Sequence, residues 1–143
     1  MNLLPPPKAK LIELQGSLEE QRRAIFFLLF SQSEITIFID CLGRVSKAQP
    51  PPYHLPFVLH IHQQEHRIIL SMLQILKRIL CVKHVVVDPI NAVETQNLGV
   101  FINLLRTLHP SLQFFLLIER KQHLLIHTDI KLITTQLLEV HNP

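Results

Sequence analysis

The stretch EHRIILSMLQILKRILCVKHVVVD, residues 65–88, decides the fold of this chain. Its first part repeats apolar pairs at helical spacing (Ile68/Ile69, Met72/Leu73, Ile75/Leu76, Ile79/Leu80), which predicts an amphipathic helix over 65–80. Its second part is rich in valine and predicts a buried strand that ends at Asp88. A helix that leads directly into a buried strand is typical of α/β domains.

The same alternation extends outward in both directions. A capping box, Ser17 with Glu20, predicts the start of a helix that runs to about Gln32. The remaining patterns predict strands over 10–15, 35–39, 57–62, 113–118 and 124–126, and helices over 98–108 and 130–140. Because parallel pairing needs crossover connections, this order predicts a three-layer α/β sandwich with a mainly parallel five- or six-stranded sheet, flavodoxin- or Rossmann-like.

Proline marks the predicted divisions of the chain. Residues 1–9, with Pro5–Pro7, are expected to form a stiff arm, and 10–143 a single domain. The segment 41–56, with Pro50–Pro52, is expected to be a long irregular loop.

Composition sets the class of protein. The chain is 48% apolar and 17% charged, which excludes a disordered regulator and a membrane protein. No apolar run is long enough to span a bilayer, and the N-terminus lacks the features of a secretory signal. Cys41 and Cys81 do not make a disulfide framework. We expect a cytoplasmic protein (nuclear if eukaryotic) that is not secreted.

Motifs for catalysis are missing. Three glycines, Gly16, Gly43 and Gly99, cannot build a phosphate-binding glycine loop, and there is no G-x-S-x-G elbow. Asp40 and Asp88 each end a predicted strand, where ligands bind in open α/β sheets. There they either hold Mg²⁺ or accept a phosphoryl group, or simply cap the next turn of the chain. The sequence leans against an enzyme.

Histidines form the one candidate metal site. His60 and His62 point to the same face of a strand, and His66, Glu65 or Asp88 can add a ligand. Paired imidazoles suit zinc or another divalent metal. The alternative is that His60 and His62 lie on the polar face of the strand, in which case we expect no cofactor.

Residues 82–120 resemble the central part of a response-regulator receiver domain: VKHVVVDP, then a helix ending LLRTLHPSLQ, then the strand FFLLI. The resemblance implies that Asp88 matches the phosphoacceptor. It departs from the pattern at Gln15, where receivers carry an acidic pair, and at Glu119, where they carry Ser or Thr. It therefore implies a degenerate receiver, with Asp88 vestigial, that acts in signalling without phosphorylation.

Two further resemblances also lack the residues or motifs that carry the chemistry of the families concerned. ETQNLGV, residues 94–100, is similar to the phosphorylated segment of anti-sigma-factor-antagonist (STAS) domains, with Gln96 in place of the serine. Inactivated RecA-like subunits of repair or assembly complexes fit the general strand–helix pattern.

The helix after Ser17 carries more apolar residues than one sheet face needs. Ala24–Phe30 is apolar all round, so Phe26, Phe27 and Phe30 either lie under neighbouring elements or form an interface. We expect a non-catalytic protein-interaction module, a regulatory or assembly subunit that binds a protein partner or forms a homodimer. The alternatives are a metal-dependent hydrolase at His60, His62 and His66, and a nucleic-acid-associated subunit of a repair or transcription complex that uses Lys77, Arg78 and Lys83.

Overall fold

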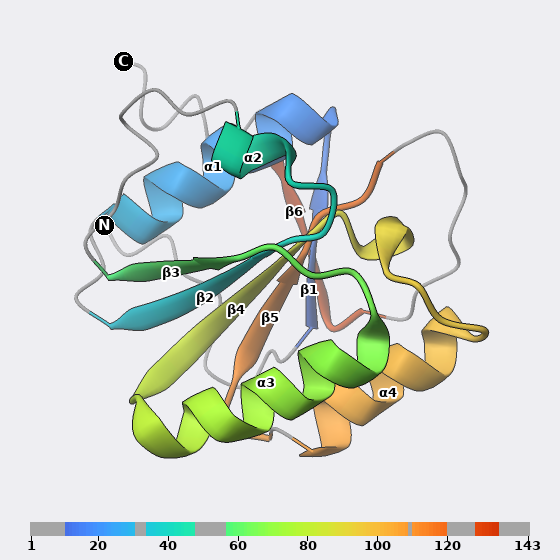
Figure 1. Cartoon of the computed structure of the whole chain (residues 1–143). Helices are drawn as coiled ribbons and strands as arrows, with labels where there is room; N and C mark the ends of the chain where they lie inside the picture. Colours follow the sequence, from blue (N-terminus) through green and yellow to red (C-terminus); the bar gives the residue numbers. More distant parts are fainter. Residues whose placement is uncertain (1–10, 31–33, 48–56, 109, 120–127, 135–143) are drawn as a thin grey trace.

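Figure 1 shows the computed structural model, which describes residues 11–30, 34–47, 57–108, 110–119 and 128–134. Strands and helices alternate along the chain, as the sequence predicts. In chain order the elements are β1 (Leu11–Gln15), α1 (Leu18–Phe30), β2 (Ile35–Asp40), α2 (Arg44–Lys47), β3 (Val58–Ile61), α3 (His66–Ile79), β4 (Val82–Asp88), a 3₁₀ turn (Ile90–Ala92), α4 (Leu98–Leu108), β5 (Gln113–Leu116) and β6 (Ile130–Ile133).

The sheet has six strands in the order β3-β2-β4-β5-β1-β6, and every neighbouring pair is parallel. The predicted α/β sandwich with a parallel sheet is confirmed. The strand order is neither of the two common doubly wound orders, 2-1-3-4-5 and 3-2-1-4-5-6, because β1 here lies between β5 and β6.

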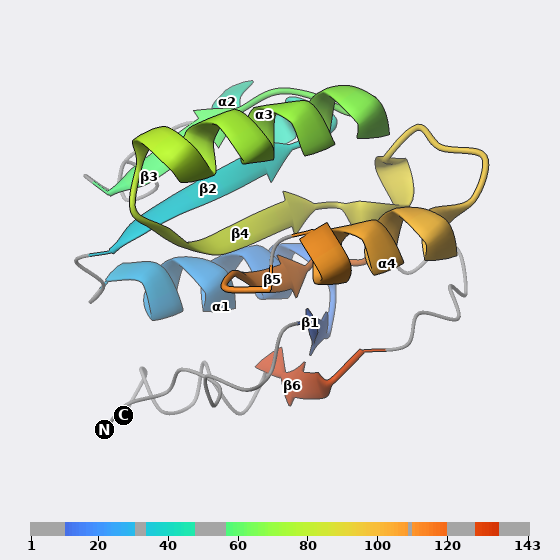
Figure 2. The same cartoon turned by 90° about the horizontal axis from the view of Figure 1, so that it is seen from below.

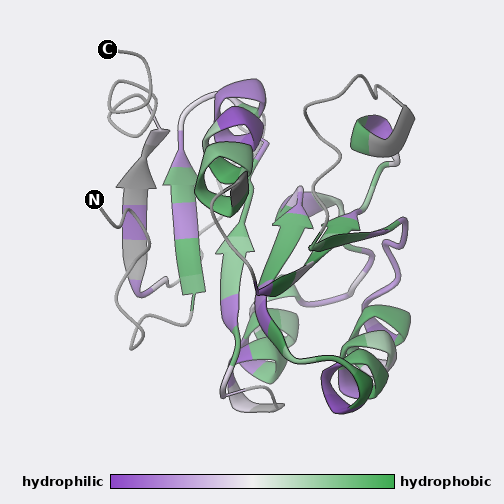
Figure 3. Cartoon of the chain, turned by 90° about the vertical axis from the view of Figure 1, so that its left-hand side faces the viewer, coloured by the Kyte–Doolittle hydropathy of each residue, from purple (hydrophilic) through white to green (hydrophobic). Residues whose placement is uncertain are grey.

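Helices cover both faces of the sheet (Figure 2). On one face α3 lies over the side of β2 and β3, and α4 lies beside it. Residues of these two helices share a core with alternate residues of the strands, such as Val85 and Val87 of β4. The opposite face packs against α1, and there Val86 is in the core. Because both faces are covered, the inner strands are hydrophobic along most of their length (Figure 3).

The predicted capping box of α1 is confirmed. The Ser17 hydroxyl accepts a hydrogen bond from the Glu20 backbone N–H at 3.2 Å, and the Glu20 carboxylate accepts one from the Ser17 backbone N–H at 3.4 Å. The pair fixes where α1 begins, three residues after β1 ends.

Two predictions about local structure are wrong. Residues 130–133 form strand β6 and not the start of a closing helix, because Ile130–Ile133 pairs with Ile12–Gln15 at the open side of β1. Within the expected irregular loop 41–56, residues Arg44–Lys47 form the short helix α2. The proline-rich arm, the loop residues 48–56, the predicted strand 124–126 and residues 135–140 lie outside the described residues.

Candidate functional site

The carboxyl ends of β2 and β4 bring Asp40 and Asp88 side by side. The two residues are register partners, so the sequence prediction that both mark this edge of the sheet is confirmed by the pairing. Asp40 is 1% exposed and Asp88 is 0% exposed. Ligands of open α/β sheets bind at this edge, and we take it as the candidate site.

An arginine from α1 holds Asp88. Arg22 Nε donates to Asp88 Oδ2 at 2.6 Å, and Arg22 Nη2 donates to Asp88 Oδ1 at 3.0 Å. The pair is therefore bidentate, the strongest geometry for guanidinium and carboxylate. Arg22 therefore holds both oxygens of the Asp88 carboxylate within the chain.

The charges of this pair are balanced against burial. Burial raises the pKa of Asp88, and the hydrogen bond and charge of Arg22 offset part of that rise. Burial lowers the pKa of Arg22, but the hydrogen bond and charge of Asp88, with the charges of Asp40 and Glu119, raise it overall. We take Arg22 as charged, because a guanidinium keeps its proton, and its charge and hydrogen bonds favour the ionised form of Asp88.

Asp40 works as a cap. Its Oδ2 accepts a hydrogen bond from the Val45 backbone N–H at 3.1 Å, at the start of α2. The turn between them needs Gly43, whose φ of +66° lies in the left-handed region. A Cβ at Gly43 would lie 3.1 Å from the His62 ring, so His62 covers this turn. The capping alternative for Asp40 is thus the one that the structure shows.

Gln21 closes the β1 side of the same edge. Its Nε2 donates to the carbonyl oxygens of Gly16 at 3.0 Å and Ile118 at 2.8 Å, and its Oε1 accepts from Ile118 N–H at 2.8 Å. The side chain is 1% exposed, and it ties α1 to the ends of β1 and β5. At the rim, Arg44 pairs with Glu119 at 3.0 Å in a more exposed salt bridge.

Cys41 follows Asp40 and lies at this edge with no exposed surface. Burial, with the charges of Asp88 and Asp40, raises the pKa of the Cys41 thiol to about 12. A thiol with that pKa is protonated at neutral pH and is a poor nucleophile.

The three candidate metal ligands are not brought together. His60 stacks on Phe38, with ring centroids 5.0 Å apart, while His66 Nδ1 lies 2.9 Å from the Glu94 carbonyl oxygen. Among the residues that the structure describes, no three His, Cys, Asp or Glu side chains form a group that can hold a metal ion. The structure does not bring His60, His62 and His66 together, because a strand, a turn and a helix carry these residues to different contacts.

The phenylalanines of α1 do not all lie on the surface. Phe26 is 7% exposed and stacks on Phe38, with ring centroids 5.6 Å apart and planes 10° apart. For Phe26 the structure shows the alternative of burial under neighbouring elements, because the helix lies with this side chain on β2. Phe27 is partly buried, and the side chain of Phe30 lies outside the described residues.

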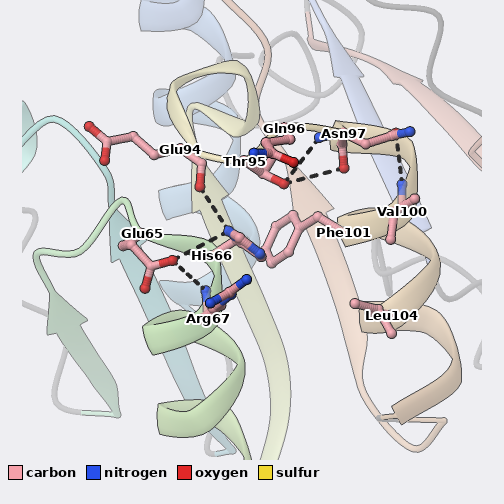
Figure 4. Close-up of a pocket in the computed structure, with 10 residues that line it drawn as sticks. All are labelled: Glu65, His66, Arg67, Glu94, Thr95, Gln96, Asn97, Val100, Phe101 and Leu104. Carbon is pink, nitrogen blue, oxygen red and sulfur yellow. Dashed lines mark hydrogen bonds and ion pairs between the residues drawn. The ribbon is translucent and has the colours of Figure 1, made fainter.

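A cavity of about 490 Å³ lies between the first turns of α3 and α4 (Figure 4). Glu65 caps α3 by accepting from the backbone N–H groups of Arg67 and Ile68, and Asn97 Oδ1 accepts from Val100 N–H in α4. These donors are already satisfied within the chain. The cavity is lined by Glu65, His66, Arg67, Glu94, Thr95, Gln96, Asn97, Val100, Phe101 and Leu104.

Sequence reasoning found Asp40 and Asp88 but missed Gln21 and Arg22. Nothing in the spacing of Arg22 and Asp88, 66 residues apart, links them. The charged pair Arg22-Arg23 is visible in the sequence, but only Arg22 turns toward the sheet, while Arg23 is exposed.

Comparisons with known proteins leave the site to be interpreted from its geometry. No family model matches the chain, and neither a curated protein nor a solved structure does. No helix in the described part of the chain is long and apolar enough to cross a bilayer.

Proposed function

We propose that this chain is a non-catalytic protein-interaction module, a regulatory or assembly subunit that acts without phosphorylation. The observation that carries the proposal is the Arg22–Asp88 pair. In a working receiver or nucleotide-binding domain, the acidic residue at such a strand end faces Mg²⁺ or phosphate. Here a guanidinium of the chain itself takes both carboxylate oxygens.

The rest of the edge supports the same proposal. Both polar atoms of the Gln21 side chain form hydrogen bonds with backbone groups at the ends of β1 and β5, and Asp40 caps α2. Each of these polar side chains has a partner that stabilises the fold, so we infer that this edge of the sheet has a structural role. We expect the functional contacts to lie on the outer surface of the domain, where binding needs no reacting groups.

The layout of this edge also bears on the kind of complex. A P-loop domain has a strand, a glycine-rich loop and a helix that together hold phosphate, and a nearby strand that ends in a magnesium-binding Asp. Here β1 leads to α1 through only Gly16 and Ser17, and α1 supplies the partner of Asp88. The layout resembles an inactivated RecA-like subunit, which favours a nucleic-acid-associated repair or assembly complex as the second candidate.

Nucleotide binding tests the first proposal. Titration calorimetry with MgATP, MgGTP and Mg²⁺ alone should give no heat of binding to the wild-type chain, and incubation with labelled ATP should give no hydrolysis. Acetyl phosphate should leave the intact mass unchanged. Stoichiometric MgATP binding, turnover, or a mass increase of one phosphoryl group lost in Asp88→Asn would overturn it.

The native complex tests the positive half of the proposal. Purification from the native cell at endogenous level, followed by light scattering, should give a mass above that of one chain, with a partner at fixed stoichiometry. A strictly monomeric chain would count against an assembly subunit. For the second candidate, a gel shift with duplex and single-stranded DNA should appear for the complex and weaken as salt rises.

A further inference from the structure

Helix α3 carries two apolar stripes. The first faces the sheet, and Ile69 and Leu73 are each 1% exposed. The second consists of Ile68 (44% exposed), the partly buried Met72, Ile75 (57%) and Ile79 (72%). We call these four residues the outer stripe.

The outer stripe has the spacing of a helix–helix seam. Its residues follow one another at steps of four, three and four, the repeat by which the a and d positions of a coiled coil face a partner helix. A helix that packs only on its own sheet needs one apolar stripe. The sequence thus supplies a second packing surface along the full length of α3.

The outer stripe lies on the flank of α3 away from α4. At about 100° per residue, it is turned to one side of Ile69 and Leu73, whereas His66 and Arg67, which line the cavity with α4, lie toward the other side. The open flank therefore faces the β3 edge of the sheet.

Strand β3 adds apolar surface on that side. Leu59 is 39% exposed and pairs with Ile37, whose side chain is in the core under α3, so Leu59 points to the same face of the sheet. Phe57, two residues earlier, is 45% exposed. Among the strands that the structure describes, β3 is the last of the sheet and pairs only with β2. Together these residues widen the outer stripe, and patches of this kind mark interaction sites.

The charge of α3 indicates what kind of molecule can cover the outer stripe. Between His66 and Ile79 the helix carries Arg67, Lys77 and Arg78 and no acidic residue, and exposed Lys83 follows it. Lys77 and Arg78 suit the negative end of a helix dipole, but Arg67 stands in the first turn, where a positive charge is unfavourable. Helix stability alone does not account for this charge, and it disfavours a second copy, because two such helices would repel each other.

We infer that the outer stripe of α3 is the docking site for an amphipathic helix of another protein, one with acidic residues beside its apolar stripe. Apolar side chains of that helix fill the spaces between Ile68, Met72, Ile75 and Ile79. Its acidic residues face Arg78, which flanks the stripe on the solvent side. The inference rests on the proposed function and adds the surface and the chemistry of the partner.

Three designed helical peptides of about three heptads test the inference. The first has a leucine seam flanked by Glu, the second the same seam flanked by Lys, and the third the Glu flanks with Ser in the seam. Fluorescence anisotropy with the full chain should show the first peptide binding at least about tenfold more tightly than either other peptide.

Variants of the full chain separate the contribution of the apolar stripe to peptide binding from that of the basic residues. Ile75→Gln with Ile79→Gln should weaken the first peptide by at least about tenfold, because two buried contacts are lost. Arg78→Glu should weaken the first peptide and strengthen the second. The matched control is Gln74→Ser, which alters an exposed residue of α3 off the stripe and should leave both affinities unchanged. Circular dichroism confirms that each variant is folded.

Several results would overturn the inference. They are no binding of the first peptide, equal binding of the Glu and Lys peptides, and DNA binding that Arg78→Glu abolishes but the isoleucine changes do not affect. A wild-type homodimer that the isoleucine changes dissociate would also overturn it, since the occupant would then be a second copy. In each case the proposed function stands, whereas MgATP turnover would remove the proposed function whatever the peptides do.

Discussion

Helices α1 and α3 lie on opposite faces of the sheet, and they differ in how many of their apolar side chains they bury. The sequence of α1 is apolar all round from Ala24 to Phe30, and α3 has a clear amphipathic repeat. From sequence, α1 is the helix with apolar residues to spare. In the structure α1 buries Ala24, Ile25, Phe26, Leu28 and Leu29, and α3 leaves three isoleucines exposed.

The cause is the number of elements that share each face. Helix α1 lies over side chains from β1, β2, β4 and β5, with Val45 of α2 beside it, so neighbours reach it on several sides. Helix α3 shares its face with α4 and lies near the β3 edge, so one flank has no neighbour among the described elements. Apolar content therefore does not identify a binding surface; the position of the helix in the sheet decides it.

Truncating a ring in the α1 layer tests the comparison with the largest effect. Phe26→Ala removes a ring stacked on Phe38 and should lower the free energy of unfolding by about 4 kcal/mol. Urea unfolding followed by circular dichroism measures it. Ile75→Ala, on the exposed stripe of α3, is the control and should change stability by less than about 0.5 kcal/mol. Similar losses for the two variants would mean that the two helices are equally covered.

The buried ion pair gives the next largest effect. Arg22→Met leaves Asp88 without its partner and should destabilise the fold by about 3 kcal/mol at neutral pH. Arg23→Met changes the exposed neighbour and should have little effect. Urea unfolding of both variants decides whether Arg22 holds the site closed.

The pH dependence of that loss has a definite sign. Burial raises the pKa of Asp88 above its ordinary value near 3.8, and Arg22 offsets part of the rise. A raised folded pKa favours the native state below the ordinary value and loses that stability as pH rises through the folded pKa. Without Arg22 the pKa of Asp88 rises further, so Arg22→Met should cost less at pH 4 than at pH 7. A loss that does not depend on pH would contradict the assigned role.

Local patterns predicted most of this fold, and long-range contacts account for what they missed. The capping box, the strand ending at Asp88 and the repeat of α3 are all set by neighbours within a few residues. The order of the strands is set by which edges meet, as when Ile130 pairs with Ile12, and no local pattern encodes it. For the same reason, residues 130–133 were predicted as part of a helix but form β6.

The candidate site was predicted only in part, for a related reason. Strand ends placed Asp40 and Asp88, because the end of a strand can be read locally. Whether an acidic residue is open or held depends on a partner from another element, here Arg22. His60 illustrates the same limit: its place on a strand was predicted, but its stacking on Phe38 comes from the register of β2 and β3.

A histidine in the α1 layer gives a smaller effect that depends on pH. His84 is 4% exposed, its ring lies near Phe115, and burial lowers its pKa below the ordinary value of 6.5. A lowered folded pKa favours the native state above pH 6.5 and loses that stability as pH falls through the folded pKa. His84→Gln should therefore flatten the fall in stability between pH 7 and pH 5. The exposed His62→Gln is the matched control, and an unchanged slope in His84→Gln would contradict the assignment.

The smallest effect on stability is expected for changes in the outer stripe of α3. The comparison of α1 with α3 depends on the size of this effect. Ile75→Gln with Ile79→Gln should change the free energy of unfolding of the isolated chain by no more than about 0.5 kcal/mol for each residue, because both side chains already contact water. Urea unfolding measures this, with Leu73→Gln, on the buried face of the same helix, as the contrast that should unfold readily. A loss of several kcal/mol from the two isoleucines would mean that the chain covers its own stripe and leaves no room there for a partner. A small loss, together with weaker peptide binding, would mean that these isoleucines serve association and not folding.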